Sequence, residues 1–352
     1  MNWPLSAEFG CKGTIFLANF QMFSRFFTTF APVKTVILEK TTRFDGDFVA
    51  TIGCFDGVHL GHQLLLRTML CEAKSRGLAS MVITFDRQPR EVFDPDFHPQ
   101  LLSTPQEKEQ LLGQMGIDTL VVLPFTRELA SLSAREFMQQ VLRKQLNVSV
   151  LVAGYDNRFG RDRREGFEDY VHYGRELGID VIRGEMERLP GDERAVSSSV
   201  IRQLLEEGRV EQMPDCLTRL YSLTGKIVAG EHIGHELGFP TANLEIDHPH
   251  KLIPAPGVYA VWAEVDSRIT NSSERMPAMM NIGTRPTFDG TRQTLEVHIL
   301  QHIGDIYGQM LTVTFVARLR SEQRFDTREE LVAQLEEDRR KTMRLLDMKT
   351  DR

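Results

Sequence analysis

The sequence predicts an α/β protein in which a parallel sheet, covered by helices on both faces, is followed by an antiparallel β-barrel and a C-terminal helix. Up to about residue 185, short apolar runs alternate with helical patterns, which is typical of strands joined by crossover helices. From about residue 219, β-rich runs follow one another, most of them separated by glycine or proline turns. A chain of 352 residues also suits two domains. We therefore expect one domain over residues 34–215 and a second over 219–348, with the boundary between Gly208 and Tyr221.

The first domain is expected to form a parallel sheet, because helix signals separate its apolar runs. A helix is expected to begin at Thr104 and another at Ser133, since a glutamate three residues later completes a capping box in each case. Gly77 and Gly178 end two other helical patterns. The expected strands cover residues 48–52, 79–85, 119–123, 148–153 and 179–182. Ligands of such sheets bind at the carboxyl ends of the strands.

The second domain is expected to be an antiparallel barrel, because no helical pattern interrupts its β-rich runs. These runs cover residues 221–228, 257–265, 277–282, 294–300 and 311–319. A final amphipathic helix is expected to begin at Thr327, where Glu330 completes a capping box. Its apolar face would carry Leu331, Leu335 and Leu345.

Composition and charge exclude several classes of function. A net charge of −7 argues against a general nucleic-acid-binding protein, which needs a basic surface to displace counterions. The four cysteines (Cys11, Cys54, Cys71 and Cys216) have neither C-x-x-C spacing nor a metal-ligand pattern, so we expect reduced thiols in a cytoplasmic protein. Self-association is left open.

Residues 1–33 are rich in phenylalanine, but polar residues such as Asn19 and Arg25 interrupt them. The segment therefore lacks the roughly 20 apolar residues of a membrane span. It also lacks the basic start and unbroken apolar stretch of a secretory signal. We expect a disordered extension, with a membrane-surface segment as the alternative.

The segment 53–62, with the sequence GCFDGVHLGH, is the strongest functional signal. It joins an expected buried strand to an expected helix. His59 and His62 would lie on one face of the first helical turn, where unpaired N–H groups and the helix dipole favour anions. The glycines allow the backbone to approach a phosphate closely. Two incidental histidines at a helix start are the alternative, but all these features would then have to coincide. The pattern predicts a nucleotide phosphate site and resembles the His-x-Gly-His signature of nucleotidyltransferases.

Two later segments could contribute to the same chemistry. The segment 154–164 places Arg158 and Arg163 just after a strand end, and guanidinium groups bind phosphate oxygens as a fork. A solvated basic loop is the alternative. The segment 197–202 begins a helix with three serines and ends its first turn with Arg202. Its alternative is plain capping by serine.

The order of these segments resembles the bacterial bifunctional riboflavin kinase/FAD synthetase family, over roughly residues 47–345. The resemblance implies a Rossmann-like nucleotidyltransferase domain followed by a riboflavin kinase barrel. By the resemblance, His59 and His62 are catalytic and act on the ATP phosphates, Asp156 faces the flavin or nucleotide, and the serine segment holds the pyrophosphate portion. The implied ATP- and phosphate-binding residues of this first domain are Gly53, Phe55, Asp56, Gly57, Gly61, Asp156, Arg158, Arg163, Ser197, Ser198, Ser199 and Arg202.

The barrel carries the sequence Pro-Thr-Ala-Asn at 240–243, which resembles the signature of riboflavin kinases. Thr241 and Asn243 offer the hard oxygen ligands that Mg²⁺ selects, although a proline-containing turn would explain these residues singly. The resemblance makes Glu296 the base that accepts the proton of the riboflavin 5′-hydroxyl. The ATP- and flavin-binding residues that it implies are Gly225, Gly230, Gly234, Gly238, Pro240, Arg285, Arg320 and Phe325.

Three residues depart from the family pattern. Gln88 and Asn157 replace residues that are usually His and Phe or His, and His235 replaces an arginine. We expect an enzyme that phosphorylates riboflavin to FMN and adenylylates FMN to FAD, with Mg²⁺, ATP and flavins as its ligands and neither nucleic acid nor membrane as a partner. The alternatives are a riboflavin kinase whose first domain is not catalytic, motivated by Gln88 and Asn157, and a non-catalytic flavin-binding protein.

Overall fold

The computed structural model describes residues 33–155, 157–185, 195–229, 239–266, 275–287, 290–301 and 306–350, and the chain divides into two compact units. The first unit holds residues 33–53, 65–85 and 111–184, and the second holds 54–64, 86–110 and the chain from 185 onward. Apart from its last residue, the expected N-terminal extension lies outside the described residues.

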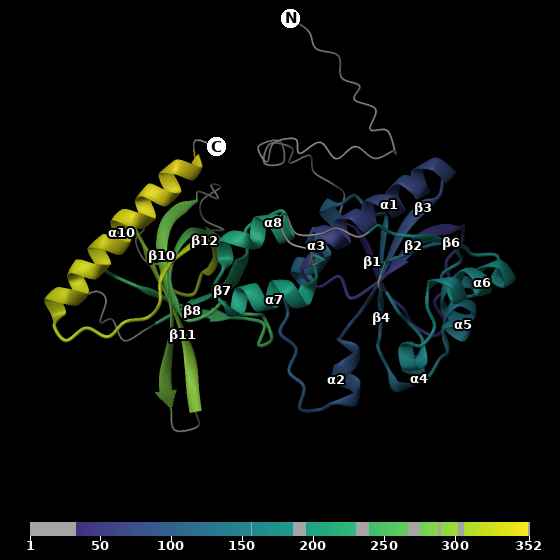
Figure 1. Ribbon diagram of the computed structural model, residues 1–352, viewed down its shortest axis with the longest axis horizontal. Helices are drawn as coiled ribbons and strands as arrows, with labels where there is room; N and C mark the ends of the chain where they lie inside the picture. Colours follow the sequence, from purple (N-terminus) through teal and green to yellow (C-terminus); the bar gives the residue numbers. More distant parts are fainter. Residues whose placement is uncertain are drawn as a thin grey trace, which may run out of the picture. The chain divides into compact units, whose positions relative to one another are not determined.

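The first unit contains a six-stranded parallel sheet with the strand order β1-β4-β3-β2-β5-β6 (Figure 1). Its strands are β1 (Lys34–Ile37), β2 (Phe48–Ile52), β3 (Ala79–Phe85), β4 (Thr119–Leu123), β5 (Val148–Ala153) and β6 (Asp180–Arg183). Four expected strands are confirmed at their bounds, and the fifth begins one residue later than expected. Strand β1 was not expected, because it is a short and mostly exposed edge strand whose pattern gives little signal.

Helices cover both faces of this sheet, as expected, with α1 on one side and α5 and α6 on the other (Figure 1). All five residues of β2 are buried, and Phe48, Ala50 and Ile52 belong to one core cluster with residues of α5 and α6. The intervening Val49 and Thr51 point to the opposite face, where they are also fully buried. The chain between β2 and β7 contains α1 (Leu60–Arg76), α2 (Pro89–Phe93), α3 (Pro105–Gln114), α4 (Arg127–Ala130), α5 (Ala134–Phe137), α6 (Phe167–Leu177), α7 (Ser198–Glu206) and α8 (Met213–Leu217), of which α2, α7 and α8 belong to the second unit.

The chain order reverses at β2. From β2 it proceeds to β3 and β4 on one side, and β5 then lies on the other side of β2. In an open α/β sheet the crevice at such a reversal, outside the carboxyl ends of the strands, is where ligands bind. Gly53 follows β2 and Gly154 follows β5, so both lie at this position in the first unit.

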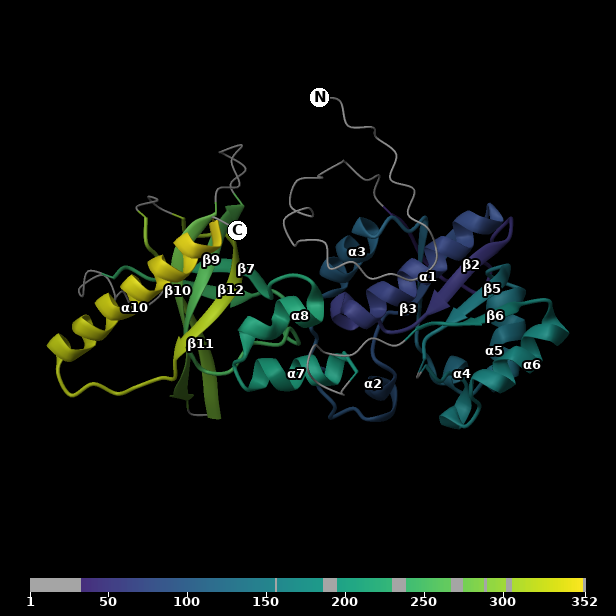
Figure 2. The same cartoon turned by 45° about the horizontal axis from the view of Figure 1, so that its top comes forward.

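The second unit contains a closed antiparallel barrel with the strand order β10-β11-β8-β7-β12-β9 (Figure 2). Its strands are β7 (Ser222–Val228), β8 (Ala242–Ile246), β9 (Gly257–Asp266), β10 (Met276–Thr287), β11 (Gly290–Ile299) and β12 (Met310–Arg320). The barrel was predicted, but β8 was not. Its Ala-Asn-Leu-Glu-Ile sequence is short and overlaps the Pro-Thr-Ala-Asn motif, so its pattern gives little signal of a strand.

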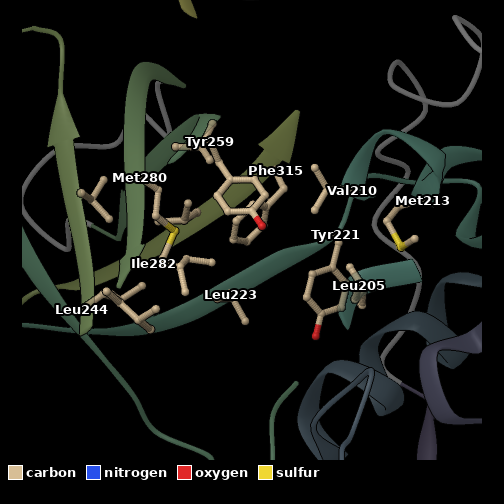
Figure 3. Packing of buried hydrophobic residues seen from close by; sticks show 14 of the residues in the cluster. Leu205, Val210, Met213, Tyr221, Leu223, Leu244, Tyr259, Met280, Ile282 and Phe315 are labelled. Carbon is tan, nitrogen blue, oxygen red and sulfur yellow. The ribbon is translucent and has the colours of Figure 1, made fainter. Parts of the chain in front are cut away.

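The barrel core is apolar and continues into the segment that precedes the barrel (Figure 3). Tyr259 and Phe315 meet edge to face with ring centroids 5.2 Å apart. Leu205 of α7 and Met213 of α8 belong to the same buried cluster as these barrel residues. Burial in one cluster therefore ties α7 and α8 to the barrel.

Helix α10 (Arg328–Thr350) packs against the outer side of β9, β10 and β12. Its expected start is confirmed by a hydrogen bond from the Glu330 N–H to Thr327 Oγ1 (3.2 Å). The expected leucine stripe is only half-buried, whereas Asp338 and Thr342 are fully buried. The buried face of the helix is therefore more polar than its leucine spacing predicted.

Among the described residues, no helix is both long enough and apolar enough to cross a membrane. Cys54, Cys71 and Cys216 form no disulfide bond, and Cys11 lies outside the described part of the chain.

Candidate functional site

The segment after Gly53 folds as a strained turn. Phe55, Gly57 and Val58 have φ values of 50°, 77° and 40°, all in the left-handed region. For a β-branched residue such as Val58 this conformation is a clear outlier, and such residues cost about 1–3 kcal/mol each. A Cβ on Gly57 would also lie 3.0 Å from Leu102 Cβ, so glycine is required there for space as well as for φ. Surrounding contacts must therefore hold the turn.

Three side chains bind the carbonyl groups of this turn. Gln63 Nε2 donates to the Val58 carbonyl (3.0 Å), and Arg219 donates to the Gly57 carbonyl (2.8 Å). The Ser198 hydroxyl donates to the Asp56 carbonyl (3.0 Å). These three hydrogen bonds stabilise the turn in its strained conformation and so position the residues that follow it.

The Asp56 carboxylate is 7 % exposed and binds a neighbouring loop. It accepts hydrogen bonds from the backbone N–H groups of Leu102 (2.9 Å) and Ser103 (3.0 Å), and it forms an ion pair with Arg202. The Arg202 guanidinium also donates to the Gln100 carbonyl (2.7 Å). Asp56 and Arg202 are thus brought together, as neighbours that fix the loop 100–103 against the turn.

His59 and His62 are also brought together, with stacked rings whose centroids lie 3.6 Å apart. The expectation that both belong to the first helical turn needs a correction, because α1 begins at Leu60 and His59 precedes it. His59 instead acts as the cap of the helix, since its Nδ1 accepts the backbone N–H of His62 (3.3 Å). A Cβ on Gly61 would approach the His59 ring to 3.3 Å, so a small residue lets the imidazole lie over the first turn.

Both imidazoles are neutral at neutral pH. Burial, and then the charges of Arg202 and Arg219, lower the pKa of His59 to about 4. Burial also lowers the pKa of His62, with smaller effects from His59 and Lys108. Because His59 Nδ1 is an acceptor, its proton is on Nε2, which can donate to a phosphate oxygen. His62 Nδ1 is buried and has no hydrogen-bond partner among the described residues. A substrate group could satisfy it.

The serines at 197 and 199 have different environments. Ser197 caps α7 by accepting the Val200 N–H (3.4 Å), which is the alternative role expected for serine at a helix start. Ser199 is exposed.

In the first unit, Asn157 donates its amide to the Ile52 carbonyl (2.6 Å) and so satisfies the last carbonyl of β2. Arg158 and Arg163 are exposed, and Asp156 lies outside the described residues.

The outer face of the barrel carries a row of polar residues across three neighbouring strands. Asn243 of β8 lies directly opposite Glu296 of β11, which lies directly opposite Asn281 of β10. The flanking residues of each strand belong to the barrel core, so this row points outward. Directly opposite residues have Cβ atoms about 5 Å apart, which places two amides beside one carboxylate. Thr241 lies two residues before Asn243 and directly precedes the first residue of β8.

Other barrel residues named from the sequence have specific contacts. His298 Nδ1 lies 2.7 Å from the Pro240 carbonyl, and a Cβ on Gly225 would lie 2.3 Å from the Glu245 carbonyl. Arg320 forms an ion pair with Asp338 (2.9 Å), and its guanidinium carbon lies 5.7 Å from the Phe325 ring centroid. Gly230, Gly234, His235, Gly238 and the side chain of Arg285 lie outside the described part of the structure.

Comparisons with known proteins match both parts of the chain. The FAD synthetase family model matches residues 41–200, and the riboflavin kinase family model matches residues 217–346. The bifunctional riboflavin kinase/FMN adenylyltransferase of Escherichia coli (strain K12) is 38% identical over 291 residues, which cover 82% of this chain and 90% of the relative. The protein of the same name from Bacillus subtilis (strain 168) is 33% identical over 303 residues, with 84% and 92% covered.

The chain belongs to the bifunctional riboflavin kinase/FMN adenylyltransferase family.

A solved structure shares the fold of this chain. A crystal structure described as a macrolide-efflux protein from Streptococcus pneumoniae has a TM-score of 0.80 and 32% sequence identity to this chain, and the likeness covers 88% of this chain and 99% of that one.

Within this family, one of the departures has a local explanation, because the side-chain amide of Asn157 binds the last carbonyl of β2. The hydrogen bond of Gln88 to Glu91 at the start of α2 uses the backbone N–H and does not depend on the glutamine side chain. The sequence did not indicate a role for Arg219, Gln63, Lys108 or Asn281. Arg219, Lys108 and Asn281 are isolated in their own local patterns, and only the folded chain brings them to a motif. Lys108, for example, donates to the Cys54 carbonyl (3.3 Å) across 54 residues of sequence. Gln63 directly follows the segment 53–62, but only its contact with the Val58 carbonyl reveals its role.

Proposed function

We propose that this protein makes both flavin cofactors in two successive reactions. The barrel transfers the γ-phosphoryl group of ATP to the 5′-hydroxyl of riboflavin, which gives FMN and ADP. The segment around His59 and His62 supports transfer of the AMP portion of a second ATP to FMN, which gives FAD and pyrophosphate. The observation that carries the proposal is that the two family models match successive parts of this one chain.

Glu296 is the proposed base of the first reaction. It accepts the proton of the riboflavin hydroxyl as that oxygen attacks the γ-phosphorus. Its place between Asn243 and Asn281 supports this role, because amide groups on both sides can orient the carboxylate. Most of the rate enhancement in phosphoryl transfer comes from positioning and electrostatic stabilisation, so an oriented carboxylate suffices.

The residues at 241 and 243 fit Mg²⁺. A hydroxyl and an amide oxygen two residues apart, at the start of one strand, are hard oxygen donors. Mg²⁺ usually binds through one or two protein ligands together with substrate phosphates, which matches this number of donors. When bound, the ion would neutralise charge on the ATP phosphates. Thr241 and Asn243 would hold it beside Glu296.

The second reaction needs no strong base, because the FMN phosphate is already an anion. His59, with its proton on Nε2, and His62 are the proposed donors to the α-phosphate of ATP. Ser198 and Arg202 support the turn that carries the histidines, and Asp56 orients Arg202.

The other proposed binding residues are carried over from the family pattern. For the adenylyl transfer they are Gly53, Phe55, Gly57, Gly61, Asp156, Arg158, Arg163, Ser197 and Ser199. For the kinase they are Gly225, Gly230, Gly234, Gly238, Pro240, Arg285, Arg320 and Phe325. We also propose the domain ranges 34–215 and 219–348, a cytoplasmic location, and neither nucleic acid nor membrane as a partner.

Incubation of the protein with riboflavin and MgATP, followed by chromatography, tests both reactions. The wild-type protein should form FMN and then FAD with release of pyrophosphate. Glu296→Gln should lose at least about a hundredfold of its FMN formation, because the amide cannot accept the proton. It should still convert added FMN to FAD. Glu264→Gln on β9 is the control, since Glu264 pairs with the exposed Arg275 and should leave both reactions intact.

Two results would contradict the proposal. Full FMN formation by Glu296→Gln would remove Glu296 as the base. Absence of FAD from the wild-type protein with added FMN would instead favour a kinase whose first domain is not catalytic.

A further inference from the structure

The adenylyl-transfer reaction builds up negative charge that the two histidines cannot neutralise. As the P–O bond between the α- and β-phosphates breaks, pyrophosphate leaves with the electron pair while an anionic FMN phosphate approaches the α-phosphorus. Both imidazoles are uncharged at neutral pH, because burial lowers the pKa of each. They can donate hydrogen bonds, but positive charge beyond that of the Mg²⁺ bound with ATP must come from another residue.

The cations around the turn are bound in different ways. Arg202 is paired with the Asp56 carboxylate, and Arg219 donates to the backbone carbonyls of Gly57 and Leu217. The Lys108 ammonium donates to the Cys54 carbonyl (3.3 Å), inside the segment 53–62. After burial and the effect of His59, its positive charge also contributes to the low pKa of His62. Burial lowers the pKa of Lys108, and the carboxylates of Asp56 and Asp86 oppose this shift by stabilising the charged ammonium.

Helix α3 holds Lys108 in place. Glu107, the preceding residue, accepts the backbone N–H of Thr104 in a capping box (2.9 Å). Its carboxylate also binds the buried ammonium of Lys251, which donates to the Leu102 carbonyl as well (2.9 Å). The first turn of α3 is therefore fixed from two sides, and Lys108 extends from it toward the segment 53–62. A charge held on a rigid element needs little reorganisation when the substrate reacts.

We propose that Lys108 is a catalytic cation of the adenylyl transfer, whose ammonium binds the phosphate oxygens of ATP that gain negative charge as pyrophosphate departs. This inference rests on the proposed function of the segment around His59 and His62. Lys108 transfers no proton, since the FMN phosphate attacks as an anion and pyrophosphate leaves as one. The unpartnered Nδ1 of His62 supports a ligand at this place, because it is a buried polar atom left for a substrate group.

The alternative is that Lys108 only holds the turn through the Cys54 carbonyl. The variants Lys108→Met and Lys108→Arg distinguish the two roles, with Lys74→Met, an exposed lysine of α1, as the control. Lys108→Met should lower kcat for FAD formation from FMN by about a hundredfold or more. It should also weaken product inhibition by pyrophosphate about tenfold. Lys108→Arg retains the charge and should stay within about tenfold of the wild-type kcat.

Riboflavin phosphorylation on the same chain reports whether each variant has folded, and it should be unchanged in all three. If Lys108→Met lost that activity too, Lys108→Gln would replace it in the same measurements. The proposal is overturned if the neutral variant keeps its kcat. It is also overturned if the neutral and arginine variants fall equally with unaltered pyrophosphate inhibition, since that pattern indicates a turn-holding role. A wild-type protein that made no FAD would instead refute the proposed function.

Discussion

The residue with the most informative environment is His59, which caps α1 through Nδ1 and is almost completely buried. The folded protein holds its pKa at about 4, against about 6.5 in an unfolded chain. Between pH 6.5 and pH 4 the unfolded chain therefore binds a proton that the folded protein does not bind. This group contributes stability that is complete above pH 6.5 and is lost as the pH falls toward 4, by up to about 3 kcal/mol.

NMR titration of ¹³C-labelled histidine checks this prediction. The His59 signal, assigned by its loss in His59→Gln, should have a midpoint near pH 4. A midpoint near pH 6.5 would show that the imidazole is solvated and can carry charge in the neutral range, which would also weaken the argument for Lys108.

At the residue scale, the sequence predicted the signature residues but not those that support them. His59, His62 and Asp56 are found because they lie within one short motif. Lys108, Arg219 and Lys251 reach the same region from distant parts of the sequence, and nothing in their local patterns distinguishes them from ordinary surface cations. Long-range contacts of this kind depend on the folded chain, so the pattern of one segment cannot reveal them.

Among the elements, α10 shows how a correctly predicted helix can have an unpredicted packing face. Its start at Thr327 and the half-burial of Leu331 follow from capping and periodicity. The fully buried Asp338 does not, because its burial depends on the charged partner Arg320 at the end of β12, which the helix pattern does not contain. The missed strands β1 and β8 are similar cases, since both are short and acquire their structure from neighbouring strands.

The Arg320–Asp338 pair gives a prediction for this helix. Asp338→Ala should lower the free energy of unfolding of the barrel by about 3 kcal/mol, because it leaves a largely buried guanidinium without its carboxylate. The change is measured by urea unfolding followed through the fluorescence of Trp262 on β9, in a Trp3→Phe background. Glu337→Ala removes an exposed ion pair from the adjacent position and should cost less than about 1 kcal/mol. If both variants lowered the free energy of unfolding equally, the buried pair would not stabilise the packing of α10 on the barrel.

For the whole molecule, the order of the two architectures was predictable from the change in periodicity near residue 219, whereas the composition of the compact units was not. The segments 54–64 and 86–110 belong to the unit that contains the barrel. Backbone hydrogen bonds between Leu101 and the chain around Lys251 contribute to this arrangement, with Leu101 N donating to the His250 carbonyl (2.7 Å). Such pairing across about 150 residues has no signal in either segment alone.

The two proposed reactions use different residues of one chain, and the product of the first is the acceptor of the second. Glu296→Gln should therefore lose FMN formation alone, and His62→Gln should lose FAD formation alone. A mixture of the two variants with riboflavin and MgATP should form FAD after a lag, because FMN released by His62→Gln must accumulate before Glu296→Gln can use it. Time-resolved chromatography measures the lag, which should shorten as FMN is added at the start. If the mixture formed FMN but no FAD, although Glu296→Gln converted added FMN, the FMN must have stayed bound to His62→Gln. Transfer of FMN would then have to occur within a single chain. Independent sites connected only by free FMN would then be the wrong description of this enzyme.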